Sequence, residues 1–456
     1  MQSHTFSRTR RGVAIPLDAK GSCPQNHVSR VDLDQQRPST SRQIPRSISL
    51  STNASTAPPA NSFHSRKSQV PPNFPPTYVA RFHDEGAVRK MVYQKLGTTD
   101  LMVSRMALGC GPIGGLFGNI DDSITAIVET ALRNGVNLID TAYWYGQSRS
   151  EEILGKVLAK VPRQSFYVST KVGRFELDFA RTFDFRADRI LESLTSSLKK
   201  LRLSYVDICF VQLHDSEFAA HENIVLYETL PALEMAKHSG KIRHIGLCGY
   251  PLAHIASVVA KSTVRVEVVM SYGHATLNDN ALGEYLHFFQ SRNIGLVNAA
   301  SLSMGLLSAE GPPPWHPASE SIKETARAAV HYCQSKNISI ERLAIDYGIN
   351  FPGVSTCVVG MDSVERVLAD IEMASTGFGI SELEQRVRDR IMRRYFDRLE
   401  NANWEGVDWA GVTVGVPRHR FSLLRAVRTS DTPPLFRGES HLDADFVLQI
   451  LVQILS

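Results

Sequence analysis

From Tyr93 onwards the sequence alternates between short strand-like runs and longer helix-like runs, and this alternation limits the possible fold more than any other feature. Eight such strand-like runs, spread over roughly 300 residues, predict a (β/α)8 barrel. A doubly wound sheet is the alternative, but the glycine-rich segment 109–115 lacks the spacing of a dinucleotide-binding turn. Ser148 and Glu151 have the spacing of a helix capping box. The expected strands lie near 103–109, 137–141, 166–171, 205–212, 242–247, 265–271, 294–300 and 355–360. The expected helices lie near 121–135, 150–160, 187–202, 223–239, 252–261, 279–292 and 319–350.

The two ends of the chain differ in composition from the part between them. Residues 1–88 are rich in Ser, Pro, Arg and Gln, and a segment of this kind is predicted to be disordered because it buries too little apolar surface. The first seventeen residues contain arginines and no acidic residue, which is also typical of a mitochondrial transit peptide. No amphipathic stripe is visible there, so a basic tail on a cytoplasmic protein is favoured. We therefore expect the barrel over 89–412 and a C-terminal extension of unassigned role over 413–456.

Composition narrows the class of protein. The first 80 residues carry ten Lys/Arg and three Asp/Glu, so the chain's net charge of +4 hides a basic tail of +7 and a remainder of −3. A mildly acidic folded part gives no reason to expect a nucleic-acid-binding surface. No apolar run reaches the roughly 20 residues of a membrane span. Six cysteines without paired spacing predict reduced thiols, and neither a metal site nor a disulfide framework is expected.

Four polar side chains lie where strand-like runs end. Asp140 closes one run, and Tyr145 follows five residues later beside Gly146. Lys171 closes the next run, and His214 follows the one after that. The carboxyl ends of parallel strands meet at one rim of a barrel, where active sites are built. The sequence therefore predicts that these four side chains share one site.

Asp, Tyr, Lys and His in this order resemble the catalytic tetrad of the aldo-keto reductases, and the resemblance runs from about Tyr93 to about Val412. It includes the motifs Asp-Thr-Ala-x-x-Tyr-Gly, Ser-Thr-Lys and Gly-Lys-Ile-Arg-His-Ile-Gly, and segment 304–319 is similar to the branch of L-galactose and D-arabinose-type sugar dehydrogenases. The resemblance implies an NAD(P)-dependent oxidoreductase that transfers hydride between a nicotinamide cofactor and a sugar aldehyde or aldose, oxidising C1 to the lactone. Family analogy favours a monomer. The alternative is a nucleotide-binding regulatory subunit similar to potassium-channel β-subunits, and the basic N-terminal tail is the one feature that favours it.

The resemblance also implies a role for each member of the tetrad. Tyr145 is expected to be the general acid and base, and a phenol with a pKa of about 10 needs help in this role near neutral pH. Lys171 would lower that pKa, Asp140 would hold Lys171 charged, and His214 would orient the substrate oxygen. Tyr143 competes for the acid role, but the Tyr-Gly motif selects Tyr145. The residues expected to line the substrate are Trp144 and Trp315.

The cofactor positions depart from the family pattern. Cys248 stands where a serine usually contacts the nicotinamide carboxamide, and His274 stands where a tyrosine usually stacks on the ring. Gly360 replaces a lysine found in NADP-preferring relatives, whereas Arg366 matches an arginine that binds the 2′-phosphate. NAD is therefore favoured, with NADP or dual use open. The residues expected to bind the cofactor are Gly111, Cys248, Ser271, His274, Ala300, Ser301, Leu302, Gly305, Gly360, Arg366 and Asp370.

Overall fold

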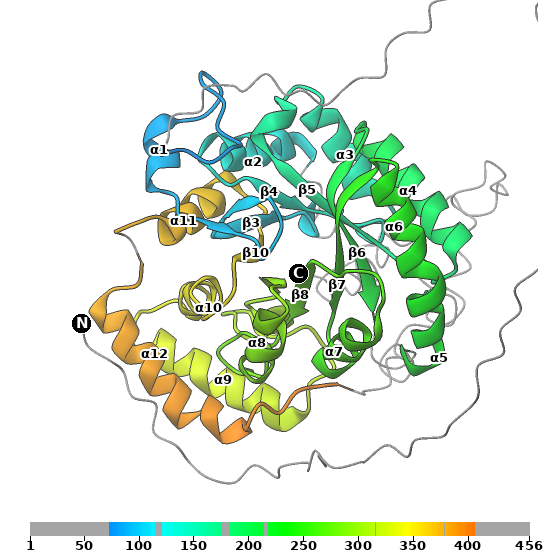
Figure 1. The fold of residues 1–456 in the computed structure, drawn as a ribbon. Coiled ribbons are helices and arrows are strands. Elements are labelled where there is room, and N and C mark those ends of the chain that lie inside the picture. The colour runs from blue at the N-terminus through cyan, green and yellow to red at the C-terminus, as the bar shows by residue number, and fades with distance from the viewer. Residues whose placement is uncertain are drawn as a thin grey trace, which may run out of the picture. The chain divides into compact units, whose positions relative to one another are not determined.

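A closed barrel of eight parallel strands forms the centre of the protein (Figure 1). The computed structural model describes residues 73–114, 121–175, 182–213, 218–314, 316–377 and 379–405. The barrel closes because β10 (Thr356–Gly360) pairs with both β3 (Met106–Gly109) and β9 (Gly295–Ala299). The predicted (β/α)8 fold is confirmed, and the doubly wound alternative fails because that sheet is open. The remaining barrel strands are β4 (Leu138–Asp140), β5 (Tyr167–Val172), β6 (Val206–Leu213), β7 (Ile242–Gly249) and β8 (Val268–Tyr272).

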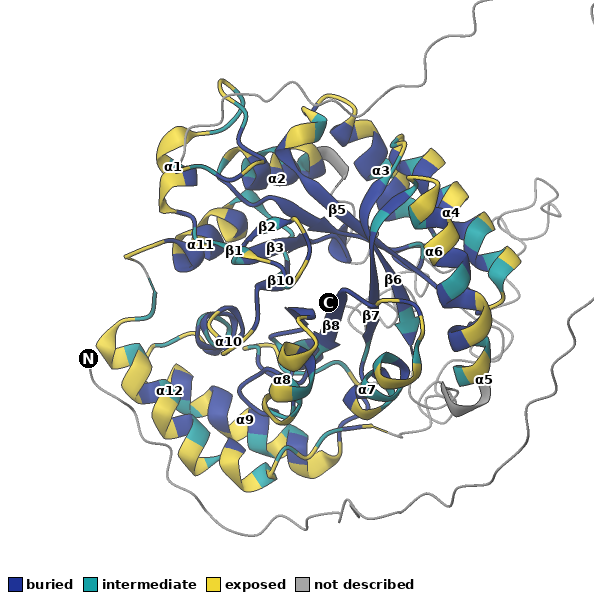
Figure 2. Ribbon diagram, in the orientation of Figure 1, coloured by how far each residue is buried: buried dark blue, intermediate teal, exposed yellow. Residues whose placement is uncertain are grey.

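Helices surround the barrel, and each has a buried side and an exposed side (Figure 2). In α4 (Ala187–Leu201), the buried residues recur every three or four positions, which is the spacing of one helix face. The stretch expected as one helix over 319–350 is two helices, α9 (Glu320–Gln334) and α10 (Ile340–Ile349). The break falls where Ser339 caps α10 by accepting a hydrogen bond from the Arg342 amide. The other helices are α2 (Asp121–Arg133), α3 (Arg149–Leu158), α5 (Phe218–Ile224), the π-helix η4 (Val225–Thr229), α6 (Leu230–His238), α7 (Leu252–Lys261), α8 (Leu282–Ser291), α11 (Val364–Ala374) and α12 (Glu382–Arg394). The short 3-10 helices are η1 (Pro112–Gly114), η2 (Arg163–Ser165), η5 (Ser303–Gly305) and η6 (Phe396–Leu399).

A hairpin plugs the end of the barrel where the strands begin. The run expected as one strand over 103–109 is divided, because β2 (Met102–Ser104) pairs with β1 (Tyr93–Lys95) outside the barrel sheet. Leu96, Leu101 and Val103 of this hairpin are fully buried among the side chains of the barrel interior. These side chains fill the end of the barrel where the strands begin.

Residues 73–88 correct the predicted boundary of the disordered extension. This stretch contains the start of helix α1 (Glu85–Lys90), and Tyr78 and Val88 are buried. Asn137, just before β4, donates a hydrogen bond of 3.0 Å to Thr77. The prediction missed these contacts because the few apolar residues near position 80 are diluted by 70 residues of polar sequence. Predictions for residues 1–72 and 406–456 lie outside the described residues.

None of the helices in the described part of the chain has the length and hydropathy needed to cross a membrane. The cysteines at positions 110, 209, 248, 333 and 357 are all buried and form no disulfide with one another. Cys23 lies outside the described residues.

Candidate active site

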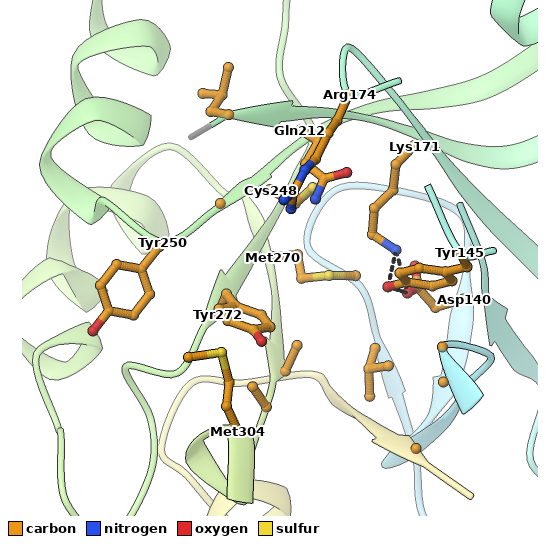
Figure 3. A pocket seen from close by; sticks show the side chains of 18 of the residues that line it. Asp140, Tyr145, Lys171, Arg174, Gln212, Cys248, Tyr250, Met270, Tyr272 and Met304 are labelled. Atoms are coloured by element: carbon orange, nitrogen blue, oxygen red, sulfur yellow. Dashed lines mark hydrogen bonds and ion pairs between the residues drawn. The ribbon is translucent and has the colours of Figure 1, made fainter. Parts of the chain in front are cut away.

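Three of the four predicted tetrad residues meet at the carboxyl end of the barrel (Figure 3). Asp140 is the last residue of β4, and it pairs in register with Ser169 of β5. Lys171 lies two residues further along β5, so its side chain points to the same side as that of Ser169. Tyr145 reaches the pair from the loop between β4 and α3. His214 lies outside the described residues, so its place in the site stays a prediction.

The ammonium group of Lys171 is buried, with 4% of the residue exposed, and has three acceptors. It donates hydrogen bonds to Asp140 Oδ2 at 2.5 Å, Tyr145 Oη at 3.0 Å and the Thr141 carbonyl at 3.2 Å. Burial lowers the pKa of Lys171, but the interactions with Asp140, Tyr145 and Cys248 together outweigh that effect and hold the pKa above its ordinary value. Lys171 is therefore a fixed cation at neutral pH.

The carboxylate of Asp140 is held on both oxygens. Ser169 Oγ donates to Oδ1 at 2.7 Å, while Oδ2 accepts from Lys171 and, at 3.4 Å, from the Tyr145 hydroxyl. A buried carboxylate is tolerated only when its lone pairs find donors, and here they do. The arrangement fixes the direction of the Lys171 side chain, as the resemblance implied.

Tyr145 is a buried phenol with 6% of its surface exposed. Burial raises its pKa above the ordinary value, and the nearby Lys171 opposes this rise without cancelling it. Lys171 lowers the pKa as expected, but desolvation is the larger effect, so the net shift is upward. Tyr145 is protonated at neutral pH and can donate a proton.

Tyr143, the competing tyrosine, faces away from this cluster. Its ring packs edge-on against Phe175 with centroids 5.6 Å apart, and the Lys200 ammonium lies 5.3 Å from the ring centre. The Lys171 ammonium donates a hydrogen bond to Tyr145, so the geometry supports the choice that the Tyr-Gly motif indicated.

The loop after Tyr145 does not form the predicted capping box. Ser148 adopts a left-handed conformation with φ of 77°, and its side chain makes no capping hydrogen bond. Glu151 instead is buried and accepts a hydrogen bond of 2.7 Å from Thr170, the neighbour of Lys171. Burial raises the pKa of Glu151. This carboxyl group ties α3 to β5 behind the site.

A pocket of about 850 Å³, counting the open space at its mouth, lies above the buried cluster. Four of the residues expected to bind the cofactor line it: Gly111, Cys248, Ala300 and Gly360. The others, which do not line this pocket, are Ser271, His274, Ser301, Leu302, Gly305, Arg366 and Asp370.

His274 is the clearest departure from the expected cofactor site. Its two ring nitrogens lie 2.8 Å from Asp279 Oδ2 and 2.6 Å from the Tyr250 carbonyl, so the ring is fixed inside the protein. Tyr272, two residues earlier at the end of β8, lines the pocket instead. The prediction did not include Tyr272, although its place at a strand end was an available signal.

Several further residues beyond the pocket are placed by their own contacts. Ser301 Oγ lies 3.1 Å from Cys357 Sγ and faces the barrel wall. Arg366 is 68% exposed and pairs with Asp362 at 3.3 Å. Asp370 is buried on α11, and burial raises its pKa to about 7.

The two tryptophans expected at the substrate have different outcomes. Trp144 is buried and does not line the pocket; the Arg174 guanidinium lies 4.1 Å from its ring centre. Trp315 lies outside the described residues. Trp404, which the prediction missed, lines the pocket and stacks on Tyr250 with centroids 5.2 Å apart. The prediction also missed Arg174 and Gln212 in the pocket wall.

Comparison with known proteins agrees with this geometry. The model of the aldo/keto reductase family matches residues 105–386. L-galactose dehydrogenase of Arabidopsis thaliana is 40% identical over 308 residues, covering 65% of this chain and 94% of that protein. D-arabinose 1-dehydrogenase of Saccharomyces cerevisiae is 30% identical over 334 residues, covering 69% of this chain and 97% of that protein. Among solved structures, an aldo-keto reductase from Bacillus halodurans superposes with a TM-score of 0.53 at 24% identity, covering 66% of this chain and 96% of that one. The last likeness supports the fold alone.

Proposed function

The chain belongs to the aldo/keto reductase family and is an NAD(P)-dependent oxidoreductase, and from this premise we propose that it oxidises an aldose at C1 to the lactone. The observation that carries the chemistry is the contact of 3.0 Å between the Tyr145 hydroxyl and the Lys171 ammonium, beside Asp140. The sugar class is supported by the two relatives, which are named for oxidising L-galactose and D-arabinose.

In this proposal Tyr145 moves the proton while the nicotinamide cofactor, when bound, exchanges the hydride. Oxidation removes a hydride from C1 and a proton from its hydroxyl group, and Tyr145 accepts that proton as phenolate. In the reverse direction the phenol gives the proton to the carbonyl oxygen. Lys171 stabilises the phenolate, and Asp140 keeps Lys171 charged and aimed at Tyr145.

The raised pKa of Tyr145 gives the two directions opposite pH dependences. Because burial favours the neutral phenol, the acid needed for reduction is present at neutral pH. The phenolate needed for oxidation grows as pH rises. We therefore expect aldose oxidation to accelerate toward alkaline pH and carbonyl reduction to slow there.

The described residues fit a nicotinamide. Small residues at or just beyond the carboxyl ends of barrel strands, among them Gly111, Cys248 and Gly360, leave room at the pocket wall. Ser271 Oγ is buried near the end of β8 and has no hydrogen-bond partner in the described part of the chain, and the register partner of Ser271 is Gly249, which lines the pocket. A carboxamide both donates and accepts hydrogen bonds, so it would satisfy this hydroxyl. Cys248 and Ser271 are the residues proposed to hold that end of the cofactor, with Tyr272 as the aromatic side chain beside the ring.

The preference for NAD rests on the charges around Arg366. This guanidinium is the group that would bind a 2′-phosphate, and such a contact is worth about 1.5–3 kcal/mol. It already pairs with Asp362, and Asp370 on the same helix also interacts with it when ionised, above its raised pKa of about 7. Two carboxyl groups beside one arginine disfavour a phosphate dianion, so we propose NAD with dual use possible.

Steady-state kinetics on a panel of aldoses with NAD and with NADP tests the proposal. Aldose-dependent formation of the reduced cofactor, with a higher kcat/KM for NAD, is the expected result. Arg366→Gln should leave the NAD value within about twofold, because no 2′-phosphate contact is lost. Tight cofactor binding without turnover of any aldose would favour a regulatory nucleotide-binding subunit. A strong NADP preference that disappears in Arg366→Gln would overturn the NAD assignment.

A further inference from the structure

We propose that Arg174 and Gln212 form a subsite that binds hydroxyl groups of the substrate, on the part of the pocket away from the proton-transferring Tyr145. This inference rests on the proposed function and deepens it, because it assigns the recognition of a polyhydroxylated carbonyl compound to two side chains. It starts from two polar groups in the pocket wall that neither the tetrad nor the cofactor positions use.

Arg174 is held in the pocket wall by the chain turn after β5 and by aromatic rings. Gly173 has φ of 99°, and a Cβ atom there would lie 2.6 Å from the Phe185 ring, so the chain turns sharply at this point. The guanidinium of Arg174 lies 4.1 Å from the centre of Trp144 and 5.7 Å from that of Phe183. The residue is buried and lines the pocket. Stacking of this kind fixes the plane of the guanidinium, which keeps its N–H groups aimed in set directions.

Gln212 lies on the adjacent strand at the same rim. Val172 of β5 pairs with Val211 of the neighbouring strand β6. Arg174 comes two residues after Val172, and Gln212 comes one residue after Val211, so the two side chains start from neighbouring points on the rim. Phe210 belongs to the barrel interior, and Gln212, two residues later, points to the same side. Both residues line the pocket, and Figure 3 shows their side chains next to Cys248.

The oxygen of the Gln212 amide indicates what kind of ligand fits. Oε1 is buried and has no hydrogen-bond partner among the described residues. A buried acceptor of this kind is unfavourable until a donor reaches it. A hydroxyl group can donate to Gln212 and accept from Arg174 at the same time, whereas a carboxylate can only accept and an alkyl chain can do neither. The pair therefore fits a hydroxylated substrate better than an acidic or an apolar one.

Two aldehydes of equal length test this assignment. Glyceraldehyde and propanal both have three carbons, and glyceraldehyde carries two hydroxyl groups that propanal lacks. The measured quantity is the ratio of kcat/KM for glyceraldehyde to kcat/KM for propanal, in the reduction direction with the preferred cofactor. Arg174→Met is expected to lower this ratio about ten- to a hundredfold, the effect of losing one charge-assisted hydrogen bond.

Two further variants keep the test sharp if Arg174→Met folds poorly. Gln212→Leu should lower the ratio about fivefold or more, as expected for a neutral hydrogen bond together with its desolvation. Arg174→Lys should give an intermediate ratio, because the charge remains while the planar fork is lost. The matched control is Arg189→Met: Arg189 also lies over an aromatic ring, Phe175 at 4.5 Å, but does not line the pocket. Its ratio should equal that of the wild type.

The outcomes separate this inference from the proposed function. If the wild type reduces both aldehydes and the ratio stays unchanged in Arg174→Met and Gln212→Leu, the subsite is refuted while the oxidoreductase assignment stands. If Gln212→Leu instead weakens binding of the reduced cofactor, Gln212 belongs to the cofactor site and the inference fails. If the wild type turns over neither these aldehydes nor any aldose, the proposed function itself fails and the subsite fails with it.

Discussion

Replacing Asp140 by asparagine would remove the negative charge 2.5 Å from the Lys171 ammonium while nearly preserving the size of the side chain. Both groups are buried, so water cannot replace the lost charge. At this separation and an effective dielectric constant of about 20, Coulomb's law gives roughly 7 kcal/mol of attraction. In the wild type, the cost of burying both ions offsets most of this attraction. In the variant the attraction is lost, but the cost of burying the Lys171 charge remains.

We therefore expect Asp140→Asn to lower the free energy of unfolding at pH 7 by about 3–5 kcal/mol. Without Asp140, burial dominates and depresses the pKa of Lys171 in the folded state. When the folded-state pKa of a lysine lies below its unfolded value, stability is lost as pH falls from the unfolded pKa toward the folded one. The loss of stability in Asp140→Asn should therefore shrink as pH rises from 7 toward 10. Lys171 then folds as the neutral amine at smaller cost.

Urea unfolding, followed by tryptophan fluorescence at pH 7 and pH 9.5, measures this effect. A double-mutant cycle with Lys171→Met isolates the pair, and the double variant should be less destabilised than the sum of the single variants by about 2 kcal/mol or more. An Asp140→Asn variant within about 0.5 kcal/mol of the wild type, or strict additivity in the cycle, would refute the reasoning. Loss of stability that does not depend on pH would show that Lys171 is not the group left unpaired.

Three other predictions follow from buried groups outside the tetrad. Burial raises the pKa of Asp370 to about 7, so the ionised carboxyl group destabilises the fold above that pH. In urea unfolding, Asp370→Asn should raise the free energy of unfolding by up to about 4 kcal/mol at pH 8 and by little at pH 4. Burial lowers the pKa of His316 to about 4, and its Nδ1 accepts the Ala318 amide hydrogen; the wild type should therefore lose stability as pH falls from 6.5 toward 4, and His316→Gln should show a smaller loss over that range. A chain that starts at residue 73 should fold with the wild-type melting temperature, whereas one that starts at residue 89 should melt lower by several degrees, because it loses the buried Tyr78 and the contact of Thr77 with Asn137.

The contact between Asp140, Lys171 and Tyr145 could be predicted because parallel strands fix it. Asp140 pairs in register with Ser169, and Lys171 lies two residues further along the same strand, at the same rim. The Tyr-Gly turn then returns Tyr145 to that rim within five residues. Strand ends and short loops leave few alternatives, so residue order alone identified this part of the site.

Loop residues could not be placed in the same way. Arg174 reaches the pocket because Phe185 blocks any side chain at Gly173, and that contact joins residues twelve positions apart. Trp404 lies beyond the region that matches the family, and it reaches the pocket by stacking on Tyr250. Neither path leaves a periodic or motif signal in the sequence.

The net pKa shift of Tyr145 could not be predicted for a different reason. The sequence shows that a lysine accompanies Tyr145, and a neighbouring cation by itself lowers the pKa of a phenol. How far the phenol is withdrawn from water depends on the packing of many side chains around it, and this is the larger effect here. For the same reason Glu151, expected in a capping box with Ser148, instead lies buried and accepts a hydrogen bond from Thr170.

The account's central claim is that Tyr145, and not Tyr143, transfers the proton. The direct test is the kcat of Tyr145→Phe and Tyr143→Phe for aldose oxidation, with cofactor affinity measured by fluorescence titration in each variant. Tyr145→Phe should lose about 10²- to 10⁴-fold in kcat while cofactor affinity stays within about threefold. Tyr143→Phe, which packs on Phe175 away from Lys171, should keep near-normal turnover. Near-normal turnover in Tyr145→Phe, together with loss in Tyr143→Phe, would contradict the assignment.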